Sequence, residues 1–175
     1  MTDDRSDTAR RRFLQVLGAG TALGAGAATA AAGGDADDDP KRPLEDPGLV
    51  TLESDDGFET TVARVEPALE ERDLQLVATV DHAANAESVD MDLPPTTLFL
   101  FGNPAVGTPL MRASRSIAID LPQKLLVWEA DGRVFVTYND PQYLGRRHEL
   151  EGVDERLANV ADALDNLARA VADGA

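Results

Sequence analysis

The hydrophobic positions of the chain follow strand-like spacing in several short segments after residue 48. Apolar or alternating runs predict strands over residues 49–54, 74–80, 96–101, 125–130 and 133–138. The run at 96–101 is nearly continuous in apolar residues, which predicts a strand buried on both faces. Asp131 and Gly132 join the last two strands, and this dipeptide favours a type I′ hairpin.

Two other segments repeat apolar residues at steps of three and four, which is the spacing of an amphipathic helix. The first contains Phe58, Val62, Val65 and Leu69. Asp55 or Asp56 is the expected cap at its start. Because proline cannot donate a backbone hydrogen bond, Pro67 is expected to kink this helix or end it early.

The second amphipathic segment lies close to the C-terminus. Its apolar residues are Val153, Leu157, Val160, Leu164, Leu167 and Val171. We expect this side to pack against the sheet, with pairing to a partner helix as the alternative. The order strand, helix, strand, strand, hairpin, helix predicts an α+β domain over residues 49–175, with helices bracketing a mostly antiparallel sheet.

The N-terminal segment carries a different signal. Arg10 and Arg11, followed by Phe13 and Leu14, match the twin-arginine export motif, and an uncharged stretch rich in alanine and glycine follows to residue 32. Residues 1–32 therefore predict export of a folded domain by the twin-arginine translocation machinery. The domain would be released outside the cytoplasm or held there by an uncleaved N-terminal segment. The acidic, glycine- and proline-rich residues 33–48 predict a disordered linker.

Composition narrows the classes of partner. The formal net charge is −16, so the surface repels phosphate backbones and nucleic-acid binding is disfavoured. Strong acidity with only two lysines, Lys41 and Lys124, is typical of a halophilic protein that folds in high salt; biased composition is the alternative reading. The absence of cysteine excludes disulfides and thiolate metal sites.

Several stretches from Phe58 to about Leu167 share an ordered pattern. They are residues 80–86 (VDHAANA), 98–104 (LFLFGNP), 107–111 (GTPLM), 119–122 (IDLP) and 138–141 (YNDP), followed by His148. In these stretches the chain resembles the family called domain of unknown function 302. The resemblance implies a fold of the TATA-binding-protein-like class, often dimeric, with no established activity. Pro67 departs from the family pattern.

The two histidines, His82 and His148, are the candidates for acid–base chemistry or metal binding. If they converge near Asp81 or Asp140, they would form a metal site or a proton-transfer pair. The alternative is that each histidine satisfies a local hydrogen bond. No serine lies in a nucleophile elbow, so serine hydrolase chemistry has no support.

Residues 102–108 have the glycine spacing of a phosphate loop, but Thr108 stands where the lysine should be. We therefore expect a turn that starts a short helix, with Asn103 bonded to its own backbone and a small anion as a candidate ligand of the helix start. Asn103, Tyr138 and Asn139 lie at predicted strand ends, where ligand pockets often open.

These observations predict an exported, non-catalytic domain that binds a small ligand or ion near His82, Asn103 and Tyr138, and that forms a homodimer. One alternative is an enzyme of unknown reaction with His82 as acid–base and Asn103 as a polar stabiliser. A second is a protein-interaction module that uses residues 153–171. The sequence identifies no cofactor.

Overall fold

The computed structural model describes residues 48–174, and the structural statements below refer to them. The predicted twin-arginine segment, with Arg10, Arg11, Phe13 and Leu14, lies outside the described residues. The predicted linker before residue 48 also lies outside them.

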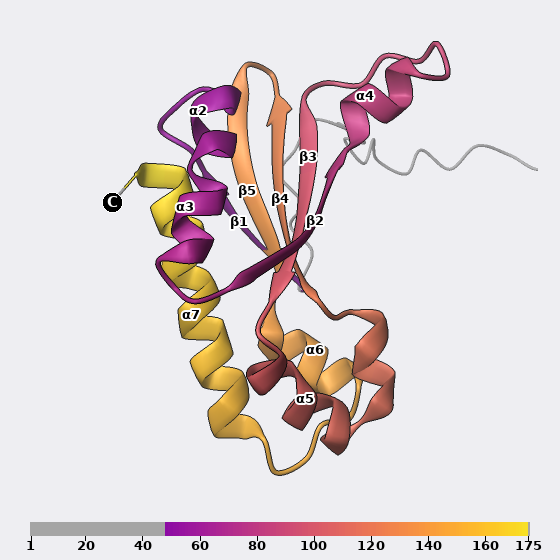
Figure 1. The fold of residues 1–175 in the computed structure, drawn as a ribbon, viewed down its shortest axis with the longest axis vertical. Coiled ribbons are helices and arrows are strands. Elements are labelled where there is room, and N and C mark those ends of the chain that lie inside the picture. The colour runs from indigo at the N-terminus through magenta and orange to yellow at the C-terminus, as the bar shows by residue number, and fades with distance from the viewer. Residues whose placement is uncertain (1–47, 175) are drawn as a thin grey trace, which may run out of the picture. The chain divides into compact units, whose positions relative to one another are not determined.

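Five antiparallel strands form one sheet in the order β1-β5-β4-β3-β2 (Figure 1). The strands are β1 (Leu49–Glu53), β2 (Gln75–Asp81), β3 (Thr96–Gly102), β4 (Gln123–Ala130) and β5 (Arg133–Asn139). The predicted α+β class and antiparallel sheet are confirmed. Asp131 and Gly132 have φ angles of 53° and 73°, so the β4–β5 connection has the positive φ values that a type I′ turn requires.

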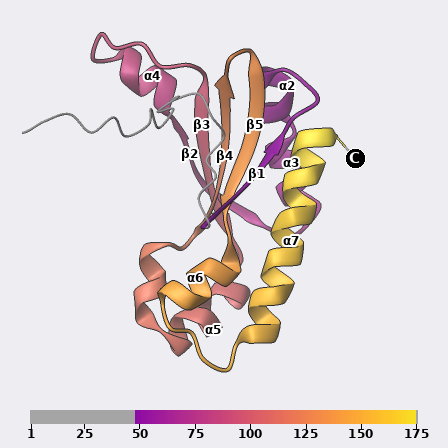
Figure 2. The ribbon, with the colours of Figure 1, turned by 180° about the vertical axis from the view of Figure 1, so that it is seen from behind.

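Strand β3 corrects one prediction. Phe99 and Phe101 are buried, whereas Leu98 and Leu100 keep part of their surface in contact with solvent. The expectation of a strand buried on both faces is therefore wrong. Helices α2 (Phe58–Ala63), α3 (Val65–Glu70) and α7 (Asp154–Asp173) lie on the Phe99 side of the sheet (Figures 1 and 2), so burial alternates along β3.

The predicted first helix is two short helices, α2 and α3, which meet at Arg64. Pro67 is the third residue of α3, where the backbone N–H has no partner within the helix, so proline is tolerated there. Gly57 is the N-cap of α2 without a side-chain cap, which corrects the predicted Asp55 or Asp56 cap. Asp56 instead pairs with Arg64.

The C-terminal helix α7 packs against the sheet as expected. Leu164, Leu167 and Val171 are buried in the same core as Phe99 and Val127. The apolar side of residues 153–171 is thus largely used inside the molecule, and it does not form the free seam that a partner-helix module needs.

Short helices gather at the two ends of the sheet. At one end lie α5 (Pro104–Ala113), the 3₁₀ helix η1 (Arg115–Ile119) and α6 (Pro141–Arg147), around a second apolar cluster of Leu110, Ile117, Leu150 and Leu157. At the other end, α4 (His82–Glu87) lies in the connection from β2 to β3 and projects away from the sheet (Figure 1). Among residues 48–174, none of the helices is long and apolar enough to cross a membrane.

Candidate functional site

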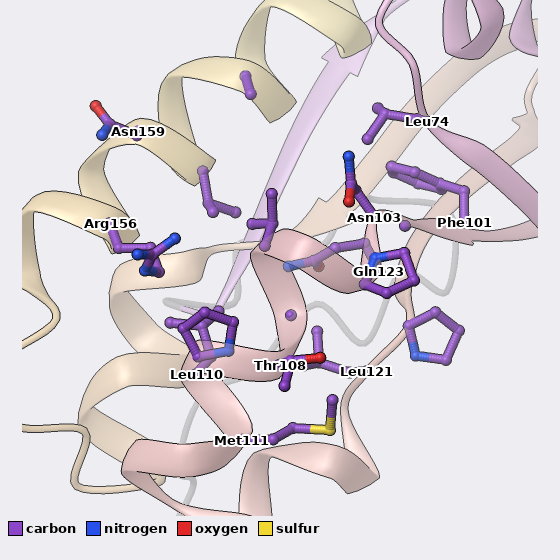
Figure 3. A pocket seen from close by; sticks show the side chains of 18 of the residues that line it. Leu74, Phe101, Asn103, Thr108, Leu110, Met111, Leu121, Gln123, Arg156 and Asn159 are labelled. Carbon is purple, nitrogen blue, oxygen red and sulfur yellow. The ribbon is translucent and has the colours of Figure 1, made fainter.

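A pocket of about 1010 Å³ lies between α5 and the first half of α7 (Figure 3). The start of β2 and residues 118–123 complete its wall. Its volume matches the upper range of small-molecule sites. Most of the lining is apolar, including Leu74, Phe101, Val106, Leu121 and Val160.

Asn103 enters this pocket as the N-cap of α5. Its Oδ1 accepts the backbone N–H of Ala105 at 2.9 Å, as expected from the sequence. Its backbone carbonyl accepts the N–H groups of Val106 at 2.9 Å and Gly107 at 3.0 Å. The start of α5 therefore has no unsatisfied N–H at these positions for the anion that was expected there. Asn103 Nδ2 makes no hydrogen bond to another described residue, so it remains as a donor toward the pocket.

Gln123 contributes an unsatisfied acceptor. It is the first residue of β4, directly after Pro122, and it lines the pocket opposite α7 (Figure 3). Its Oε1 atom is buried and has no hydrogen-bond partner within residues 48–174. A buried acceptor left unpaired costs free energy, which a ligand donor would recover.

Helix α7 supplies further polar side chains of the pocket and the only two ionisable ones among its described lining residues. Arg156 and Asn159 lie on the side of the pocket across from Asn103 and Gln123 (Figure 3). Arg156 makes no ion pair with any other described residue. Glu155 also lines the pocket and is the one carboxylate among its described lining residues.

His82 lies far from this pocket. It is the first residue of α4, whose cap is Asp81: the Asp81 carboxylate accepts the N–H of Ala84 at 2.9 Å. In the β2–β3 register Asp81 faces Thr97, whereas Gln75 faces Gly102 at the pocket end. Asp81 lies six positions after Gln75 along the strand, which is a distance of about 20 Å. The structure thus separates His82 from Asn103, and the predicted common site of these residues does not form.

The two histidines also do not converge. His148 ends α6 with its side chain 6% exposed, and α6 lies at the opposite end of the sheet from α4 (Figure 1). Residues 48–174 contain no group of three or more histidine, aspartate or glutamate side chains placed to hold a metal ion. The predicted joint metal or proton-transfer site is therefore not assembled.

His148 is instead held by local hydrogen bonds, the alternative that the sequence left open. Its Nε2 lies 2.6 Å from Asp120 Oδ2, and its Nδ1 lies 2.8 Å from Ser116 Oγ. A carboxylate only accepts, so in the neutral ring Nε2 carries the proton and the Ser116 hydroxyl donates to Nδ1. This chain of bonds joins η1 to α6, and none of its three residues lines the pocket.

Tyr138 and Asn139 also lie apart from the pocket lining. Tyr138 is 5% exposed and belongs to the main core. Burial, together with the nearby carboxylates of Asp165 and Asp140, raises the pKa of Tyr138 to about 12, so its phenol is neutral at ordinary pH. Asn139 is the half-buried last residue of β5.

Of the site residues predicted from the sequence, Asn103 lines the pocket, whereas the sequence pattern did not point to Gln123, Arg156 and Asn159. These three carry no local motif: Gln123 begins a strand, and the other two lie on the polar positions of an amphipathic helix. The turn chemistry of Asn103-Pro104 was the one local signal of the pocket.

The fold and the pocket define a small α+β domain with a ligand-sized pocket at one end of an antiparallel sheet. The chain belongs to the family described as Domain of unknown function DUF302, whose model matches residues 50–172. A crystal structure of an uncharacterised conserved DUF302 protein from Bacillus stearothermophilus has the same fold. Its TM-score is 0.65 at 17% sequence identity, over 70% of this chain and 97% of that one.

The chain is also similar to curated proteins named as fluoride-specific ion channels. The relatives from Brucella suis and Brucella abortus are both 42% identical over 112 residues, or 63% of this chain. The match covers 44% of the Brucella suis protein and 42% of the Brucella abortus protein. This chain therefore spans less than half the length of these relatives.

Proposed function

We propose that this protein is a non-catalytic binding or accessory domain that holds a small molecule in the pocket between α5 and α7. The observation that carries the proposal is the combination of a large, mostly apolar pocket with polar groups that lack partners in the described residues. These groups are Asn103 Nδ2, Gln123 Oε1 and the Arg156 guanidinium. Such convergence of a few polar groups on an apolar cavity is typical of ligand sites.

The pocket chemistry favours binding over catalysis. Its described lining contains no histidine, serine or cysteine, and its one carboxylate is Glu155. The enzyme alternative depends on His82 acting with Asn103, and these residues lie at opposite ends of the sheet. General acid–base catalysis requires the two groups to reach the same reacting atom, so the separation weighs against this alternative.

The curated relatives are consistent with an accessory role. They are longer proteins named for an ion channel, and this chain matches less than half of each. In the part of this chain that the structure describes, no helix is suited to cross a membrane. We therefore propose a role as a binding domain that accompanies other activities, and we assign no channel function to residues 48–174.

We further propose that the domain is exported through the twin-arginine route and works as a homodimer. Arg10 and Arg11 are the residues that the route would recognise. Replacing both by lysine should retain the protein in the cytoplasm, whereas Arg112→Lys should leave export unchanged. Native mass spectrometry of the exported protein should show a dimer mass and the cleavage point; a monomer at micromolar concentration would refute the dimer.

The binding proposal is tested with N-phenyl-1-naphthylamine, a neutral apolar probe that fluoresces when it leaves water. Gly107 lines the pocket, and a Cβ atom there would meet only Leu121 Cδ1, at 3.7 Å. Gly107→Leu should therefore fold and fill part of the pocket, and probe binding should fall at least tenfold. Ala113→Leu, on the same helix and outside the pocket lining, is the matched control. Unchanged binding in Gly107→Leu would refute this pocket as the site.

A further inference from the structure

The pocket wall formed by α7 changes from polar to apolar along the helix. Arg156 and Asn159 come first, and Val160, Ala163 and Leu164 follow. Residues at these spacings share one side of a helix. Leu164 lies eight positions after Arg156, so the change from polar to apolar residues extends over about 12 Å. That length accommodates a medium-length alkyl chain with its head at the Arg156 end.

The opposite wall mixes apolar and polar side chains. Leu74 and Phe101 pack in the same apolar cluster as Val160 and Leu164 of α7. Asn103 and Gln123 supply polar atoms across from Arg156 (Figure 3). A bound molecule would therefore meet a largely apolar lining and a few groups that exchange hydrogen bonds.

Arg156, the cationic side chain of the described pocket lining, indicates the sign of the charge on the ligand's head group. Arg156 is a guanidinium without an ion-pair partner among the described residues, and Asn103 Nδ2 is a second donor. Guanidinium groups bind carboxylates with two parallel hydrogen bonds. Glu155 opposes this preference, but it follows from the helix geometry that Glu155 and Arg156 point in directions about 100° apart.

We propose that the natural ligand is a medium-chain amphiphile with an anionic head group. This proposal rests on the proposed binding function. The head pairs with Arg156, and the tail lies along Val160, Ala163 and Leu164. A net charge of −16 attracts cations in general, so selection of an anion must come from this local pairing.

Competition against N-phenyl-1-naphthylamine tests the head group. Decanoate, decanol and decyltrimethylammonium share a tail and differ in charge, and each is used below its micelle concentration. Decanoate should displace the probe at a lower concentration than either of the others. Arg156→Gln should lower the affinity for decanoate about fivefold, which is the scale of a solvent-exposed charge pair, and leave the affinity for decanol unchanged.

Two further variants provide the controls. Arg112→Gln removes the same charge from α5 outside the pocket lining, so it should not alter decanoate binding. Glu155→Gln should strengthen decanoate binding, because it removes a like charge from the pocket wall.

The outcomes separate the two proposals. If the neutral probe binds in the pocket but the three competitors act alike, or the cation competes best, the anionic class is wrong and the binding function stands. An equal loss of decanoate affinity in Arg112→Gln and Arg156→Gln would also overturn the anionic ligand class. If the probe does not bind at all, the proposed function itself fails.

Discussion

Among the buried side-chain nitrogens and oxygens of residues 48–174, only Gln123 Oε1 lacks a hydrogen-bond partner. Other buried polar groups are paired locally: Ser54 Oγ lies 2.8 Å from Thr61 Oγ1, and His148 bonds to both Ser116 and Asp120. Folded proteins leave few such atoms unpaired, so the exception marks a place where ligand contact is expected.

Replacing Gln123 by methionine should stabilise the ligand-free protein. Methionine has a similar shape and removes the unpaired acceptor, so the free energy of unfolding should rise by about 1 kcal/mol. Urea denaturation measures it. Gln75→Met is the control, since Gln75 lines the same pocket but is exposed, and its effect should stay within about 0.5 kcal/mol. A loss of stability in Gln123→Met would contradict this account of Oε1.

Tyr138 gives a pH-dependent prediction. Its pKa in the folded protein is about 12, against an ordinary value of 10.0, because burial opposes the phenolate. An unfolded chain therefore loses this proton first. The stabilisation is complete below pH 10 and is lost between pH 10 and pH 12, by up to about 1.4 kcal/mol per pH unit.

Urea unfolding at several alkaline pH values should show this loss in the wild type and not in Tyr138→Phe. The ultraviolet absorbance of tyrosinate provides an independent measurement, since the sequence has only two tyrosines. Identical pH profiles for the two proteins would show that Tyr138 does not titrate in this way.

At the scale of elements, α7 holds the domain together. One side of the helix is buried against the sheet and α3, and Leu167 is 0% exposed. The same helix forms one wall of the pocket through Arg156, Asn159 and Val160. Leu164 belongs both to the core and to the pocket lining, so stability and binding share part of this one element.

Leu167→Ala should lower the free energy of unfolding by about 2–5 kcal/mol, because it leaves a cavity in the core. Asp162→Ala, at an exposed position of the same helix, should change it by less than about 0.5 kcal/mol. Thermal and urea unfolding measure both. A folded, equally stable Leu167→Ala protein that only lost a partner would instead support the interaction-module alternative.

At the scale of the whole molecule, the dominant property is charge. The net charge of −16 makes the folded state repel itself when salt is low. Salt shortens the Debye length from about 30 Å at 0.01 M to about 3 Å at 1 M. The melting temperature should therefore rise by several degrees over this range of potassium chloride.

A variant with fewer carboxylates serves as the control. Glu59, Glu66 and Glu70 are exposed on α2 and α3, and replacing them by glutamine reduces the repulsion. This variant should be more stable at low salt and gain less from added salt. A melting temperature that falls with salt would contradict the proposed adaptation to high salt.

The sequence by itself determined the strands, the β4–β5 turn, the cap at Asn103 and the buried side of α7. Each of these depends on residues close together in the chain, through periodicity or turn chemistry. Family membership was also readable, because ordered motifs from residue 80 to His148 carried it. Short helices such as α4 and α6 were not predicted, since six or seven residues are too few to establish a helical period.

Only the tertiary structure decided which candidate residues meet. The antiparallel register places His82 and Asn103 at opposite ends of the sheet, although both follow or end strands in the sequence. The tertiary structure also brings Gln123 and Arg156 into the same pocket as Asn103, although they lie 20 and 53 positions further along the chain. The physical reason is that local propensities set each element, whereas the order of strands in the sheet and the packing of α7 set distances between them.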